Sequence, residues 1–310
     1  REGRHVIRRN PLLTTALLLT GAIAVWGSVD TEGLTALATG LVDLQFASRA
    51  WFIMASVTFM VVVSIVVAAS RHGRIRLGRD DERPEFSTVS WLSMLFSAGM
   101  GVGLLFWATA EPLSHFLLVR DSGRPDPANA ALFLTNFHWG IHAWAIYGLT
   151  GLVIAYFSYR LGCPSLVSAP IVRVCGDGRT WRTVGWLSDL VAIVAIAIGV
   201  GGSVAMGVFQ VQAGVESLLG LDPTGLPLAL GIFALLVAAC GPPLLVGLDR
   251  GMALLSKTAM GIAGGLLVYI LLFGPTHFLM QGVLESIGDY VTLVLPHGLR
   301  TYTFMDDHVD

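Results

Sequence analysis

The sequence predicts an all-α integral membrane protein that crosses the bilayer several times. Of its 310 residues, 54% are hydrophobic and only 13% are charged, whereas an ordinary soluble domain carries roughly 25% charged residues. The chain also contains seven apolar stretches long enough to span a bilayer. This composition excludes a nucleic-acid-binding domain, a disordered chain and a typical soluble enzyme, because too few polar side chains remain to cover a soluble surface.

Each predicted span is a stretch of about 20 mostly apolar residues, the length that crosses the hydrocarbon core. The stretches are residues 11–29, 51–70, 89–108, 130–158, 187–214, 227–247 and 258–280. The fourth and fifth are longer, so we expect them to be tilted or broken. Residues 282–295 then carry apolar residues at helical spacing and predict an amphipathic helix along the membrane surface. The polar tail Pro296–Asp310 is not expected to span.

The distribution of basic residues predicts the orientation, because loops rich in Arg and Lys stay in the cytoplasm. With a cytoplasmic N-terminus, 15 of the 19 basic residues lie inside and four lie outside. Those inside are Arg1, Arg4, Arg8, Arg9, Arg71, Arg74, Arg76, Arg79, Arg83, Arg160, Arg173, Arg179, Arg182, Arg250 and Lys257, and those outside are Arg49, Arg120, Arg124 and Arg300. We therefore expect a multi-pass protein of the plasma (inner) membrane with its N-terminus in the cytoplasm and residue 310 outside.

The third span contains a cluster of glycines, Gly99, Gly101 and Gly103. Each glycine costs a helix about 1 kcal/mol relative to alanine, so the span unwinds most easily here. Unwound backbone at membrane depth is tolerated where it lines a cavity, as in secondary transporters. The alternative is close helix packing through the Gly99–Gly103 pair. Glu111 and Pro112 are expected to end this span, with the carboxylate either solvated or in a structural pair.

The fourth span carries Trp139, Trp144 and Tyr147, which share one broad face of a continuous helix at 100° per residue. Converging aromatic faces suit a quaternary ammonium or sulfonium group, which has no N–H to donate and is held by cation–π attraction and dispersion. The alternative is an interfacial aromatic belt. His138 and His142 lie on the opposite side; we expect them to form structural hydrogen bonds rather than a metal site, since no third ligand has suitable spacing.

Two further features are expected to be structural. The fifth span contains Gly199, Gly201, Gly202 and Gly207, for which close helix packing is the favoured interpretation. The three cysteines, Cys163, Cys175 and Cys240, are too scattered for a zinc site or a disulfide framework. Because the chain begins at Arg1 rather than methionine, we also expect it to be a piece of a longer protein.

Two strings, GMGVGLLFWATAEPLSHF (99–116) and FHWGIHAWAIYGLTGLVIAY (137–156), resemble the betaine/choline/carnitine transporter family. The resemblance implies a LeuT-like fold with a five-plus-five inverted repeat preceded by two spans, twelve spans in all. Only the first repeat is present in this chain. It divides the chain into residues 1–88 (an N-terminal segment, two spans and a basic loop), 89–281 (the first repeat) and 282–310 (the surface helix and tail).

The resemblance also assigns site residues. Trp139, Trp144 and Tyr147 resemble the family's aromatic box, and Gly99, Met100, Gly101, Val102 and Gly103 its unwound segment beside the substrate. The backbone carbonyls near Ser97 and Met100 resemble half of a sodium site. Choline-accepting members tend to carry Asp at the position of Gly103, so glycine is expected to favour a zwitterion. Ile196 and Val200 fall where sodium-coupled members place hydroxyl groups, which puts a second ion site in doubt.

The implied function is a secondary active transporter that imports a quaternary ammonium or sulfonium compatible solute, glycine betaine above all, by alternating access with sodium coupling. Sodium is then the coupling ion; no cofactor, resident metal or enzymatic activity is expected. The expected partners are the substrate, the lipid bilayer and, by resemblance, two further copies in a homotrimer, but no nucleic acid. The alternatives are a sodium-independent carnitine/choline-type exchanger and, outside the class, a seven-span receptor or sensor.

Overall fold

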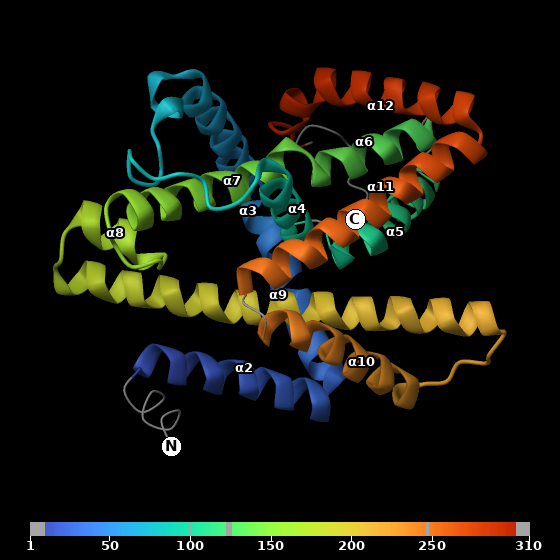
Figure 1. Ribbon diagram of the computed structural model, residues 1–310, viewed down its shortest axis with the longest axis horizontal. Coiled ribbons are helices and arrows are strands. Elements are labelled where there is room, and N and C mark those ends of the chain that lie inside the picture. Colours follow the sequence, from blue (N-terminus) through green and yellow to red (C-terminus); the bar gives the residue numbers. More distant parts are fainter. Residues whose placement is uncertain (1–9, 100, 122–125, 246–247, 302–310) are drawn as a thin grey trace. The chain divides into compact units, whose positions relative to one another are not determined.

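The computed structural model describes residues 10–99, 101–121, 126–245 and 248–301, and within these residues it contains helices and no β-strand (Figure 1). This confirms the predicted all-α class. The chain divides into two compact units, each assembled from segments distant in sequence. The first unit comprises residues 1–82, 136–199 and 289–310, and the second comprises residues 83–135 and 200–288.

The first unit combines whole helices with parts of helices that continue in the second unit. It holds α2 (Pro11–Val29), α3 (Thr31–Ala69), the 3₁₀-helix η1 (Arg71–Arg74), α7 (Ile141–Ala155), the π-helix η2 (Tyr156–Arg160), α8 (Ser168–Cys175), the first part of α9 (Arg179–Leu219), the end of α6 (Pro127–Trp139) and the end of α12 (Thr276–His297).

The turn between α2 and α3 depends on one residue, Asp30. Its backbone N–H donates to the carbonyl of Trp26 at 2.8 Å and so ends α2, while its carboxylate accepts the N–H of Gly33 at 2.9 Å and so begins α3. Serving both helix ends in this way satisfies backbone groups that the helices themselves leave free. Helix α3 therefore starts at Thr31, twenty residues before the predicted span 51–70, and its 39 residues make it about 58 Å long.

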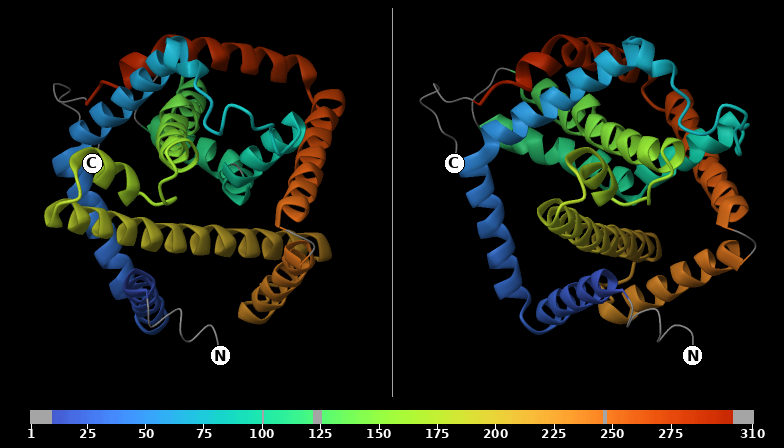
Figure 2. Two further views of the ribbon diagram at one scale, coloured as in Figure 1. Left: turned by 60° about the vertical axis from the view of Figure 1, so that its left-hand side comes forward. Right: turned by 90° about the vertical axis from the view of Figure 1, so that its left-hand side faces the viewer.

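Helices α3 and α7 pack against each other in the first unit (Figure 2). The buried residues of α3 are Thr58 and Val61, and those of α7 are His142 and Ala145. In each helix the two are three residues apart and therefore share one face. Small or medium side chains on both faces allow the close approach that drives helix association in membranes.

Two carboxylates fix the connections of this unit. Asp189 on α9 is buried and accepts the N–H of Ser168 at 2.9 Å, so a negative charge caps the N-terminus of α8. Asp80, in the connection after η1, accepts from both terminal nitrogens of Arg160, the nearer at 2.8 Å. The Arg160 guanidinium, first by hydrogen bonding and then by its charge, holds the pKa of Asp80 below its ordinary value of 3.8.

The second unit contains α4 (Thr88–Gly99), α5 (Val102–Asp121), most of α6, the remainder of α9, α10 (Leu226–Leu245), α11 (Leu248–Phe273) and the first part of α12. Helix α4 packs on α11, and their buried residues Ser90, Ser93 and Ala253 are small. Beside them, α9 and α10 share a core of Val208, Ala229 and Ile232.

The loop that joins α9 to α10 is fastened by a carboxylate. Glu216 accepts the backbone N–H of Thr224 at 2.9 Å, the hydroxyl of Thr224 at 2.7 Å and the side-chain amide of Gln212 at 2.9 Å. The same amide also lies 3.2 Å from the carbonyl of Gly225. Glu216 and Gln212 thus hold residues 224 and 225 of this turn through their side chains.

Six described helical stretches are long and apolar enough to cross a membrane, compared with seven predicted spans, and one of the six, Pro127–Arg160, combines α6, α7 and η2. The predicted third span is split into α4 and α5, and the apolar part of α10, Leu226–Gly241, is shorter than a span. The predicted seventh span, 258–280, is wrong at its end, because α11 stops at Phe273. Pro275 cannot continue a helix, and α12 begins at Thr276.

Helix α12 therefore starts six residues before the predicted surface helix, and it has the length and composition of a span. Its position along the surface stays a prediction. Large apolar side chains are exposed on nearly every helix, among them Leu18, Phe59, Val191, Leu235 and Leu272. Exposed apolar surface on this scale fits a protein whose helices face lipid.

Candidate functional site

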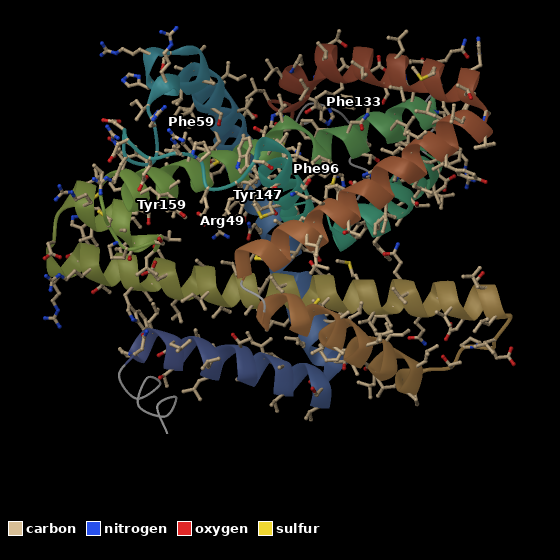
Figure 3. All side chains as sticks on the ribbon, in the orientation of Figure 1. Arg49, Phe59, Phe96, Phe133, Tyr147 and Tyr159 are labelled. Atoms are coloured by element: carbon tan, nitrogen blue, oxygen red, sulfur yellow. The ribbon has the colours of Figure 1, made fainter. Side chains whose placement is uncertain are left out.

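The candidate site has an aromatic part, built on α6 and α7. Trp144 and Tyr147 lie one turn apart on α7, with ring centroids 6.2 Å apart and ring planes inclined by 55°. Trp144 is 38% exposed and Tyr147, labelled in Figure 3, is 70% exposed. Trp139 is the last residue of α6 and is half-buried. The Trp144–Tyr147 pair thus offers two inclined aromatic faces, an arrangement that attracts an organic cation.

The prediction that Trp139, Trp144 and Tyr147 share one continuous helix is wrong. Helix α6 ends at Trp139 and α7 begins at Ile141, with Gly140 between them in a non-helical conformation (φ −93°, ψ −149°). The length of the fourth span predicts that it is tilted or broken, but it does not predict where a break lies. The angle between Trp139 and the pair on α7 is therefore set by this break, and the role of the three aromatics stays a prediction.

The same break separates the two histidines. His138 is exposed on α6, whereas His142 is buried on α7, so they do not form an i, i+4 pair on one helix. His142 Nε2 lies 3.3 Å from the hydroxyl of Thr58, and that hydroxyl donates to the carbonyl of Gly298 at 2.8 Å. Because the hydroxyl has a single proton, Nε2 must be the donor to Thr58. The expected structural hydrogen bond is confirmed for His142.

The glycine part of the candidate site lies in the second unit. Helix α4 ends at Gly99 and α5 begins at Val102, so the predicted break in the third span is confirmed. Gly101 is exposed, and a Cβ there would lie 3.0 Å from the carbonyl oxygen of Ser97. Gly103 is half-buried in the first turn of α5. Met100 lies outside the described residues, and its assignments to substrate and sodium stay predictions.

Ser97 lies in the last turn of α4, just before this break. Its side-chain oxygen is buried, and no hydrogen-bond partner for it occurs among the described atoms. A buried hydroxyl without a partner is uncommon, because it loses water without regaining a hydrogen bond. The sequence predicted a role in sodium binding for the backbone carbonyl near Ser97. The structure shows that the side-chain hydroxyl of Ser97 is a further polar group at this place.

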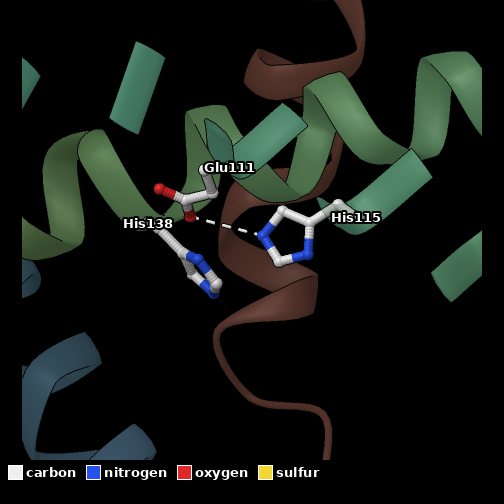
Figure 4. Close-up of side chains that lie close together, drawn as sticks. All are labelled: Glu111, His115 and His138. Atoms are coloured by element: carbon white, nitrogen blue, oxygen red, sulfur yellow. Dashed lines mark hydrogen bonds and ion pairs between the residues drawn. The ribbon is translucent and has the colours of Figure 1, made fainter. Parts of the chain in front are cut away.

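The sequence predicted that Glu111 and Pro112 end the third span, and this prediction is wrong. Helix α5 continues through Pro112 to Asp121, and Glu111 is buried with only 9% of its surface exposed. Its carboxylate lies 3.3 Å from Nε2 of His115, one turn further along the same helix (Figure 4). Of the two alternatives, a solvated carboxylate and a structural pair, the structure shows the pair. His138, also drawn in Figure 4, belongs to the first unit.

The second glycine stretch, Gly199, Gly201, Gly202 and Gly207, lies in α9. A Cβ added at Gly199, Gly201 or Gly202 would meet no atom within 4 Å. The predicted packing role of these glycines stays a prediction. Ile196 and Val200, both more than half exposed on the same helix, bring no hydroxyl group to a second ion site.

Helices long and apolar enough to cross a membrane, with large apolar side chains exposed on most of them, define the chain as part of a polytopic membrane protein. The family model for "BCCT, betaine/carnitine/choline family transporter" matches residues 11–309. The chain belongs to this family. The family transports solutes rather than catalysing reactions on them, which agrees with the predicted absence of enzymatic activity and rules against the receptor alternative.

Several relatives are similar over most of the chain. An uncharacterized transporter of Mycobacterium tuberculosis is 42% identical over 264 residues, which cover 83% of the chain and 44% of the relative. A glycine betaine transporter of Bacillus subtilis is 34% identical over 287 residues, covering 92% and 56%. An ectoine/hydroxyectoine transporter of Virgibacillus pantothenticus is 29% identical over 302 residues, covering 96% and 60%. The chain spans about half the length of the curated relatives that it matches.

Proposed function

We propose that the protein containing this chain is a secondary active transporter that imports a quaternary ammonium or sulfonium compatible solute, with glycine betaine as the first candidate. The observation that carries the proposal is the exposed Trp144–Tyr147 pair on α7, beside the break at Gly140. The glycine betaine transporter among the relatives supports the same substrate class.

The energetics favour this substrate class. A quaternary ammonium or sulfonium group has no N–H to donate, so it is held by cation–π attraction and dispersion. Each aromatic face contributes about 0.5–2 kcal/mol to its binding. Micromolar affinity requires about 8 kcal/mol, so two or three faces supply a substantial part of it. We assign the remainder to the glycine segment, residues 99–103, which contains the break between α4 and α5, with backbone groups near Ser97 and Met100 holding a coupling sodium ion. A broken helix of this kind exposes backbone carbonyls, as in other secondary transporters.

The first test is uptake of radiolabelled glycine betaine into proteoliposomes that contain the native gene product. Trp144→Ala removes one aromatic face and is expected to raise KM about tenfold or more. Trp181→Ala is the matched control, because Trp181 is 41% exposed compared with 38% for Trp144 and lies at the start of α9. Equal uptake by the two variants would refute the binding assignment.

Coupling and selectivity are tested in the same vesicles. Replacing sodium with potassium is expected to abolish concentrative uptake; unchanged uptake would instead support the exchanger alternative. Gly103→Asp introduces a carboxylate at the start of α5 and is expected to shift preference from glycine betaine toward choline. An unchanged ranking of the two substrates would contradict the proposed role of Gly103.

The proposal also includes the orientation, with the N-terminus in the cytoplasm, alternating access across the membrane and a homotrimeric assembly. Cys175 is exposed at the end of α8, in a loop assigned to the cytoplasm. In a variant that retains only this cysteine, a membrane-impermeant maleimide is expected to label permeabilised cells and not intact ones. Labelling of intact cells would reverse the orientation.

A further inference from the structure

The break at Gly140 is held open by a residue far away in the sequence. A Cβ at position 140 would lie 2.5 Å from the carbonyl oxygen of Asn136 and closer still to the hydroxyl of Tyr290. Neither neighbour leaves room for a side chain. Glycine at this position is therefore required by the close approach of Tyr290, and Tyr290 occupies the point where the two helices part.

Tyr290 also satisfies the backbone that the break exposes. In an unbroken helix the N–H of Ile141 would donate to the carbonyl of Phe137. Here the N–H of Ile141 donates to the hydroxyl oxygen of Tyr290 at 2.6 Å. The first amides of a helix lack partners within the helix, and in a bilayer no water is available to replace them. The tyrosine hydroxyl therefore stabilises the start of α7 at Ile141.

A second contact ties the same segment to the next residue of α7. Gly298, directly after α12, accepts a hydrogen bond from Thr58 at 2.8 Å, and Thr58 accepts one from His142. Phe137 packs against the rings of both His142 and His297, with centroids 4.7 and 4.8 Å away. The segment Tyr290–Gly298 thus contacts the backbone of residue 141 and, through Thr58, the side chain of residue 142.

We propose that the segment Tyr290–Gly298 positions the aromatic face, and that Tyr290 is a positioning residue for substrate binding. Tyr290 fixes where α6 ends and α7 begins, and so sets Trp139 relative to the Trp144–Tyr147 pair. Without its hydroxyl, the N–H of Ile141 regains its bond to the preceding turn or stays unpaired, and in both cases the position of Trp139 relative to the Trp144–Tyr147 pair is no longer fixed by this contact. This inference rests on the proposed function of those aromatics.

The test is Tyr290→Phe in the native gene product, which removes one oxygen and keeps the ring. Loss of the hydrogen bond from the hydroxyl of Tyr290 to the start of α7 is expected to raise the KM for glycine betaine about fivefold to tenfold. The maximal rate per transporter is expected to stay within about twofold, since the ring and its packing remain. Tyr159→Phe is the matched control, because Tyr159 is 71% exposed in η2.

A second measurement does not depend on uptake. Hydrogen exchange of a peptide covering residues 140–144 is expected to be faster in Tyr290→Phe than in the wild type and Tyr159→Phe. A general loss of stability would instead speed exchange throughout α7 and lower the maximal rate without raising KM. That pattern would reduce Tyr290 to a structural residue and overturn the inference.

The outcomes separate this inference from the proposed function. If Trp144→Ala weakens uptake while Tyr290→Phe matches Tyr159→Phe in KM, the inference fails and the proposed function stands. If Trp144→Ala leaves uptake unchanged, the aromatic face is not the binding site and both fail. A raised KM together with faster exchange at residues 140–144 supports the inference.

Discussion

Gly298→Ala is expected to destabilise the protein by about 3 kcal/mol, because the new methyl group has no room. The Cβ of residue 298 would lie 2.8 Å from the hydroxyl oxygen of Thr58 and 3.1 Å from Cε1 of His142, with Nε2 of His142 closer still. Carbon contacts are normally 3.5–4.0 Å. Both neighbours are buried, on α3 and α7, which pack on each other, so little room is left for either side chain to move aside.

The magnitude follows from what must give way. The methyl group displaces the hydrogen bonds of Thr58 to Gly298 and of His142 to Thr58, which are 2.8 and 3.3 Å long. A buried polar group left unpaired costs about 1–3 kcal/mol, and overpacking of a tight contact costs about 1–3 kcal/mol. A value from the lower half of each range, added together, gives a total cost of about 3 kcal/mol. Gly298 does not have a positive φ angle, so the expected loss of stability comes from this contact and not from backbone strain.

The assay is thermal unfolding of the purified protein in detergent at one fixed heating rate, because membrane proteins often unfold irreversibly. The apparent melting temperature of Gly298→Ala is expected to fall by roughly 5–10 °C. Gly282→Ala in α12 is the control, since a Cβ there meets no atom within 4 Å. It is expected to be neutral or stabilising by up to about 1 kcal/mol. Equal melting temperatures for the two variants would show that Gly298 does not pack as described.

Three further predictions use other parts of the chain. Gly202→Ala meets open space in α9 and is expected to raise the melting temperature slightly; a clear decrease would indicate a partner that packs on this glycine. Glu216→Ala is expected to speed proteolysis within residues 220–225, because the N–H and hydroxyl of Thr224 lose their acceptor; unchanged cleavage would show that the turn is held otherwise. The carboxyl of Asp80 is expected to titrate below 3.8 by carbon-13 NMR, and Arg160→Gln should return it toward that value. Since the folded-state pKa is lowered, the contribution of this pair to stability is complete above pH 3.8 and is lost as the pH falls through the lowered value; a midpoint unaffected by Arg160→Gln would contradict the pairing.

Some features could be predicted from the sequence because their causes are local. The break between Gly99 and Val102 follows from three glycines in five residues, each of which weakens a helix by itself. The membrane class follows from composition alone. The polar turn at Asp30 was not predicted, although an aspartate between two apolar runs is a recognisable helix cap.

Other features could not be predicted, because they depend on distant partners. Glu111 has a proline after it and reads locally as a helix end, yet it is buried in α5 and paired with His115. The aromatic motif reads as one continuous helix because Gly140 alone is a weak signal. Its break needs Tyr290, which lies 149 residues from Ile141 along the chain.

By itself, the sequence determined that this is a helical membrane protein, that its third span breaks at the glycines, and which family it resembles. These properties depend on residue composition and short motifs, which do not require knowledge of neighbouring helices. The tertiary structure decided where α7 starts, which histidine is buried, and how the end of α12 meets Thr58 and His142. Backbone groups at a helix break must find partners, and in an apolar surrounding the partner is whichever side chain the fold brings within hydrogen-bond distance.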